Sequence, residues 1–151
     1  MKILSQRDPI WSEKKLGSSN LTIGKFGCTT TCLSMLTDYY GSYMRPDAIA
    51  GQKGWYTDKN HKGGAGLVLW SKMKLPMKFV KRTYGRDDIE FEKALKDPKR
   101  AVMFEVQGKH WVLGLSKNIL GGYRIADPWD ARKKTIEAYG GQITGAAFFT
   151  I

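Results

Sequence analysis

The sequence predicts an α+β fold, in which a helical N-terminal half packs on a C-terminal antiparallel sheet. Two observations support this fold class. Apolar residues recur with a helical period from Cys28 to Tyr40. The last third instead contains short β-rich segments separated by turn residues. No internal repeat, low-complexity stretch or flexible linker divides the 151 residues, so we expect a single domain spanning 1–151.

The N-terminal half is predicted to hold two helices. Residues 1–27 contain a proline and several glycines, and we expect them to be extended and loop-rich. The helix over 28–40 follows a glycine, and Gly41 supplies its C-cap. A second, short helix is expected over 46–50, with Pro46 in its first turn.

The middle of the chain is predicted to be mixed. Residues 51–66 are polar and glycine-rich, which indicates a long loop, and 66–73 are expected to form a short buried helix. Residues 77–82 alternate weakly and indicate a strand. A helix is predicted over 87–95, because Asp87 can cap it and an apolar stripe follows.

The last third is predicted to be an antiparallel sheet. Glycine-containing turns separate its first three strands, so these strands are expected to form consecutive hairpins. The predicted strands cover 101–106, 110–116, 123–126 and 143–151.

The chain is strongly basic, with a formal net charge of +11 and a pI near 9.7. This charge favours loose attraction to anionic polymers such as nucleic acid or cell-wall polymer. The basic residues are scattered along the chain, which argues against specific nucleic-acid readout. No apolar run is long enough for a membrane span or a signal peptide. We expect a monomer in the cytoplasm or in a phage particle, unless another route exports it.

The two cysteines, Cys28 and Cys32, are candidates for chemistry rather than for a disulfide. Residues four apart in one helix have poor geometry for a disulfide bond. Cys28 lies at the predicted helix start, where free N–H groups and the helix dipole stabilise a thiolate, the nucleophilic form of the side chain. The alternative is a buried and inert cysteine.

His110 and Asp127 are expected to meet at one end of a hairpin. His110 begins one predicted strand and Asp127 ends the next, so the two residues lie at the same edge of the sheet. There the histidine can act as a base, and the carboxylate can fix its tautomer. The alternatives are an exposed loop histidine and an aspartate that merely opens a turn. Gln6 is a further candidate, because its amide can donate to an oxyanion together with the Cys28 N–H.

These motifs together resemble a papain-like cysteine peptidase family, in the stand-alone branch related to bacteriocin-processing (double-glycine) peptidases. The resemblance rests on Gln6, on GKFGCTTT at 24–31, on GKHWV at 108–112 and on YRIADP at 123–128. It implies a papain-like fold across nearly the whole chain. It also implies that the cysteine is the nucleophile, the histidine the base, the aspartate the orienting group and the glutamine an oxyanion donor.

Three alternatives remain open. The same residues can support transpeptidation instead of hydrolysis. A metal site could use Cys28, Cys32, His61 and His110, although their spacing fits zinc motifs poorly. A catalytically inactive module could bind peptide or glycan through its five tryptophans.

The sequence therefore predicts a cysteine hydrolase that cleaves a peptide or amide bond without a metal or an organic cofactor. The expected catalytic residues are Cys28, His110, Asp127 and Gln6. The expected substrate is a peptide or protein, including the peptide stem of cell wall. The candidate substrate contacts are Gly27, Trp111 and Trp129.

Overall fold

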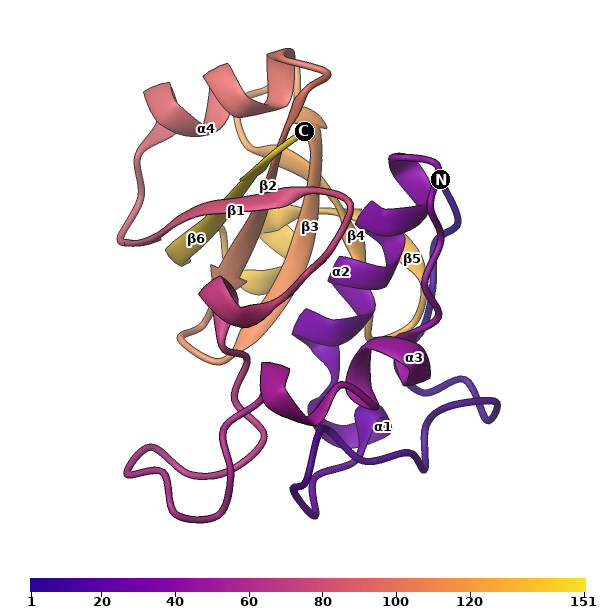
Figure 1. Ribbon diagram of the computed structural model, residues 1–151. Helices are drawn as coiled ribbons and strands as arrows, with labels where there is room; N and C mark the ends of the chain where they lie inside the picture. Colours follow the sequence, from indigo (N-terminus) through magenta and orange to yellow (C-terminus); the bar gives the residue numbers. More distant parts are fainter.

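A six-stranded antiparallel sheet forms the centre of the computed structural model, which describes all residues 1–151 (Figure 1). The strand order is β1-β6-β2-β3-β4-β5, so the last strand of the chain lies between the first two. The strands are β1 (Lys78–Tyr84), β2 (Arg100–Val106), β3 (His110–Lys117), β4 (Tyr123–Asp127), β5 (Arg132–Thr135) and β6 (Ile143–Thr150).

Helices cover both faces of this sheet. The long helix α2 contacts β3, whereas α4 contacts β2 and β3 from the opposite side (Figure 1). The shorter helices lie beside α2 in the N-terminal half. The helices are α1 (Ile23–Phe26), α2 (Cys28–Tyr39), α3 (Pro46–Ala50) and α4 (Asp88–Lys96), and the 3₁₀ turns are η1 (Lys53–Trp55), η2 (Trp70–Lys72) and η3 (Ile136–Tyr139).

Strand β2 shows how the sequence produces this layering. Successive side chains of a strand point to opposite faces. Ala101 and Met103 accordingly join the cluster around α2, while Val102, Phe104 and Val106 join the cluster around α4. Both faces are buried, which explains why residues 101–104 of this strand are a continuous apolar run rather than an alternating one.

Most predicted elements are confirmed, and so is the α+β class. Asp87 caps α4 as expected, since its carboxylate accepts a hydrogen bond from the Glu90 N–H (3.1 Å). The helix predicted over 66–73 is wrong, because only the single turn η2 forms there and none of its residues is buried. The sequence does not predict strand β5, because its residues Arg-Lys-Lys-Thr lack the apolar alternation of a strand. The strand forms by pairing with β4 at the edge of the sheet.

The start of α2 is fixed by a close approach of backbone to backbone. Helix α1 ends at Phe26, and Gly27 alone joins it to α2. A Cβ atom on Gly27 would lie 2.5 Å from the carbonyl oxygen of Ile23. Only glycine fits at this junction, and the junction sets where Cys28 begins the helix. No helix of the protein combines the length and the apolar character needed to cross a membrane.

Gly27→Ala is expected to lower the free energy of unfolding by about 1–3 kcal/mol, the usual cost of forcing extra atoms into a packed site. Urea unfolding measures the change. Gly54→Ala is the matched control, because a Cβ atom there meets nothing within 4 Å. If Gly27→Ala and Gly54→Ala have the same free energy of unfolding, the close approach of backbone at Gly27 is contradicted.

Candidate active site

Cys28 is the first residue of α2 and lies in a cleft between that helix and the sheet. Its side chain is 9% exposed and lines a cavity of about 550 Å³. Gly27 occupies the N-cap position and offers no side chain to cap the helix, so the free N–H groups of the first turn remain available. A negative charge on Sγ or on a bound oxyanion is favoured at this helix end.

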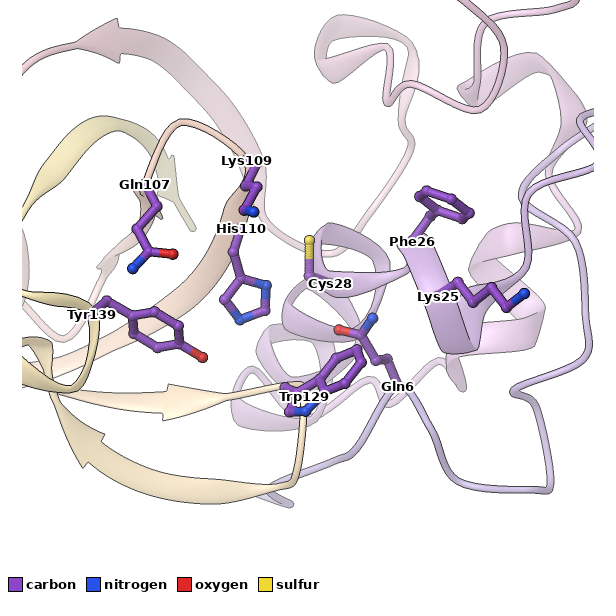
Figure 2. A pocket seen from close by; sticks show the side chains of 9 residues that line it. All are labelled: Gln6, Lys25, Phe26, Cys28, Gln107, Lys109, His110, Trp129 and Tyr139. Atoms are coloured by element: carbon purple, nitrogen blue, oxygen red, sulfur yellow. The ribbon is translucent and has the colours of Figure 1, made fainter.

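His110 opens β3 and faces the same cleft from the sheet side (Figure 2). Its Nε2 atom lies 2.9 Å from Asp127 Oδ1. This contact leaves Nδ1 as the ring nitrogen free to exchange a proton with the Cys28 thiol, and Figure 2 shows the imidazole next to the sulfur. The imidazole ring also packs on Tyr139, with ring centroids 5.3 Å apart.

Asp127 is completely buried, yet all its capacity to accept hydrogen bonds is used. Oδ1 accepts from His110 and from the backbone N–H of Trp129 (3.0 Å). Oδ2 accepts from the ammonium of Lys134 (2.7 Å) and from the hydroxyl of Tyr139. A buried carboxylate is tolerable only with such partners, because burial without them costs several kcal/mol. The aspartate therefore orients the imidazole from a fixed position.

The β3–β4 hairpin brings these two residues together, as the sequence predicts. Leu113 pairs with Ala126, which places the start of β3 diagonally opposite the end of β4. The two side chains, 17 residues apart in the chain, share one face at this edge. The pairing of β3 with β4 therefore brings the two residues to the same edge of the sheet.

The charges and hydrogen bonds around His110 and Asp127 favour a protonated imidazole. Burial by itself lowers the pKa of His110, but hydrogen bonds to Asp127 and Cys28 outweigh it and raise the pKa to about 9. Burial by itself raises the pKa of Asp127, and the bonds from His110, Lys134 and Tyr139 outweigh it and hold this pKa below its usual range. The aspartate therefore stays ionised throughout the physiological range, and the imidazole beside Cys28 is protonated at neutral pH.

Gln6 is anchored in the cleft from two sides. Its backbone N–H donates to Pro128 O (2.6 Å), and its side-chain Nε2 donates to Gly24 O (3.1 Å). The side chain is 2% exposed and lines the cavity beside Cys28 (Figure 2). Because Nε2 carries two protons, one remains after the bond to Gly24, and it can be donated to an oxyanion. Oε1 has no hydrogen-bond partner in the protein.

The cleft around Cys28 continues into a second cavity of about 380 Å³. Phe26, Cys28 and Lys109 line both spaces. The first, which we call the His110 cavity, is lined by Gln6, Lys25, Phe26, Cys28, Gln107, Lys109, His110, Trp129 and Tyr139. The second, which we call the apolar cavity, includes Leu21, Tyr56, Leu67, Val68, Trp70 and Trp111 in its lining.

The predicted substrate contacts have different positions. Trp129 is 42% exposed, lines the His110 cavity and carries the Arg7 guanidinium over its ring at 4.3 Å. Trp111 is mostly buried in the core and reaches only the apolar cavity. Gly27 does not line the His110 cavity, because it lies at the α1–α2 junction and packs on Ile23.

Two residues of the site were not singled out from the sequence. Lys134 lies on β5, which was not predicted, and it binds Asp127 and also Asp130 (3.0 Å). Tyr139 ends η3 and reaches Asp127 from there. Neither residue has a local sequence signal, because tertiary contacts bring them to the carboxylate: the pairing of β5 with β4 positions Lys134, and the packing of η3 against β4 positions Tyr139.

The remaining cysteine and histidine do not join the site. Cys32 is fully buried one turn below Cys28, its Sγ lies 3.6 Å from Trp111 O, and burial raises the pKa of its thiol. His61 is exposed in the 51–66 loop, where its Nδ1 accepts from the Gly63 N–H. No three His, Cys, Asp or Glu side chains gather as a metal site would need.

No protein-family model matches the chain, and no curated protein matches its sequence at a significant level. A function must therefore be inferred from the cleft itself. The cleft brings together a thiol at a helix start, a base, a buried carboxylate that orients the base, and an amide donor. This arrangement suits nucleophilic attack on a carbonyl carbon.

Asp127→Asn is expected to lower the pKa of His110 toward the ordinary value of about 6.5.

The raised pKa of His110 also makes the stability of the native protein depend on pH. In the native protein His110 binds its proton more tightly than in the unfolded chain. The stabilisation it contributes is fully present below about pH 6.5 and is lost as the pH rises through about 9. NMR titration of the imidazole measures the pKa, and urea unfolding between pH 6 and 10 measures the stability.

The matched control for this variant is Asp58→Asn, in the exposed 51–66 loop. It should leave the His110 titration unchanged. A native His110 that titrates near pH 6.5 would contradict the pairing with Asp127.

Proposed function

We propose that the protein is a papain-like cysteine hydrolase, related to the bacteriocin-processing peptidases, that cleaves a peptide or amide bond through a thioester intermediate. The observation that carries the proposal is the position of His110, held by the buried Asp127 on one side and facing Cys28 on the other. The papain-like fold is supported by a nucleophile at a helix start that faces a base on an antiparallel sheet.

In the first step, the Cys28 thiolate attacks the carbonyl carbon of the scissile bond. The Sγ–C bond forms, and the carbonyl oxygen takes the negative charge. The Cys28 N–H and the free proton of the Gln6 amide are the candidate donors to this oxyanion. The imidazolium of His110 then gives its Nδ1 proton to the departing nitrogen, and the C–N bond breaks to leave a thioester.

In the second step, water replaces the amine. His110, now neutral, takes a proton from water, and the hydroxide equivalent attacks the thioester carbonyl. The C–O bond forms, the C–Sγ bond breaks, and the carboxylic acid product leaves. The proton remains on His110, which restores the thiolate–imidazolium pair. Asp127 stays ionised in both steps, because the hydrogen bonds from Lys134 and Tyr139 hold its pKa low.

Iodoacetamide alkylation across pH tests the nucleophile directly, with mass spectrometry to locate the modified cysteine. Cys28 should react preferentially below pH 7, because the imidazolium stabilises its thiolate. Cys32 is the internal control, since it is fully buried and should stay unmodified in the folded protein. The low-pH reaction should disappear in His110→Ala. Reaction of Cys28 only above about pH 8, as for an ordinary thiol, would contradict the proposal.

Hydrolysis of an N-acetylated peptide library tests the activity. Cys28→Ala and His110→Ala should each lower kcat/KM by at least about 10³-fold, since the residues act as a unit. Ile119→Ala is a suitable control, because its side chain is 99% exposed in the β3–β4 turn. Equal cleavage by the native protein and by Cys28→Ala would assign the activity to something other than this cleft.

A further inference from the structure

The position of His110 relative to Cys28 gives the direction in which a substrate lies. Since His110 protonates the departing nitrogen, the amine side of the substrate lies toward His110. The acyl side then extends away from it, into the apolar cavity, which touches Cys28 but not His110. The His110 cavity continues past the imidazole to Gln107 and Tyr139, so space remains beyond the scissile nitrogen (Figure 2).

Gln107 has an unusual backbone for its residue type. It follows β2 in a turn closed by the Lys109 N–H to Val106 O bond (3.2 Å). The φ angles of Gln107 and Gly108 are 55° and 68°. Positive φ at both central residues is typical of a type I′ turn, which strongly favours asparagine or glycine at the first of them. Glutamine at this place is strained, and strain of this kind is common at functional sites.

The side chain of Gln107 lies at the rim of the His110 cavity. Its carboxamide points into the His110 cavity toward Tyr139 (Figure 2). The side-chain hydrogen bond at this turn joins the Gly108 N–H to Thr144 Oγ1 (3.1 Å), and the Gln107 amide makes none. An exposed amide with a donor and an acceptor free suits the peptide groups of a bound chain.

We propose that Gln107 binds the backbone of the substrate on the amine side of the scissile bond, which makes the protein selective for extended peptides over simple amides. The inference rests on the hydrolase function proposed above. It names the substrate class as a chain that continues for at least one residue past the cleaved bond, so that the protein acts as an endopeptidase and not as a deamidase.

The experiment compares three series of substrates that share one set of N-acetylated amino acids as the acyl group, so that each substrate has a single bond after that residue to compare. The series end in a carboxamide, in an alanine amide or in a tri-alanine amide, so only the leaving group differs. The native protein should cleave the tri-alanine series with the highest kcat/KM. In Gln107→Met, which keeps the length and the backbone strain but lacks the amide, the ratio of tri-alanine to carboxamide cleavage should fall about fivefold. Differences in leaving-group chemistry cancel, because the ratio is compared between variants.

Two further variants separate binding from strain. Gln107→Gly removes the amide and also suits the positive φ, so it should lower the same ratio while the protein melts at an equal or higher temperature. Gln52→Met is the matched control, because this exposed glutamine lines neither cavity. It should leave the ratio unchanged.

If the native protein cleaves all three series with the same kcat/KM, the inference about Gln107 is wrong but the hydrolase proposal still stands. An unchanged ratio in Gln107→Met would have the same consequence. Failure of the native protein to cleave any series, together with a Cys28 that iodoacetamide does not modify below pH 7, would overturn both.

Discussion

The burial of Asp127 is the constraint on which the site depends. A carboxylate with no exposed surface would be strongly destabilising alone, and four hydrogen bonds offset that cost. These bonds come from β3, from the turn after β4, from β5 and from η3. The same contacts that satisfy the charge therefore fix the elements around it. His110 takes its orientation from this network and not from the cleft surface.

The nucleophile reaches the cleft from the opposite half of the chain. Gly27 sets the first turn of α2, and the helix packs on β3 through the larger of the buried clusters. Gln6 links the two halves, since its backbone binds Pro128 and its side chain binds Gly24. The thiol and the base thus belong to different layers, and the distance between them depends on how α2 packs against the sheet.

Much of this arrangement could be predicted from local patterns. The hairpin of β3 and β4 follows from alternating strands and turn residues, and it implies the meeting of His110 and Asp127. The hydrogen bonds from Lys134 and Tyr139 to Asp127 could not be predicted. The basic segment that forms β5 has no apolar alternation, so the sequence does not indicate that it pairs at a sheet edge. The helix expected over 66–73 does not form: Gly66, Leu67, Val68 and Trp70 line the apolar cavity, and only the turn η2 is present there. The left-handed backbone of Gln107, which directs its side chain to the His110 cavity, is not revealed by any sequence pattern.

The most direct test of the central claim is to trap the acyl-enzyme. The protein is mixed with the p-nitrophenyl ester of N-acetyl-phenylalanine and quenched in acid within one turnover, and the acyl group is located by mass spectrometry. We expect one acyl group on Cys28, none on Cys32, and loss of the adduct in His110→Ala. Acylation confined to lysines, or Cys28 acylation that is equally fast without His110, would contradict a thiolate activated by this imidazole.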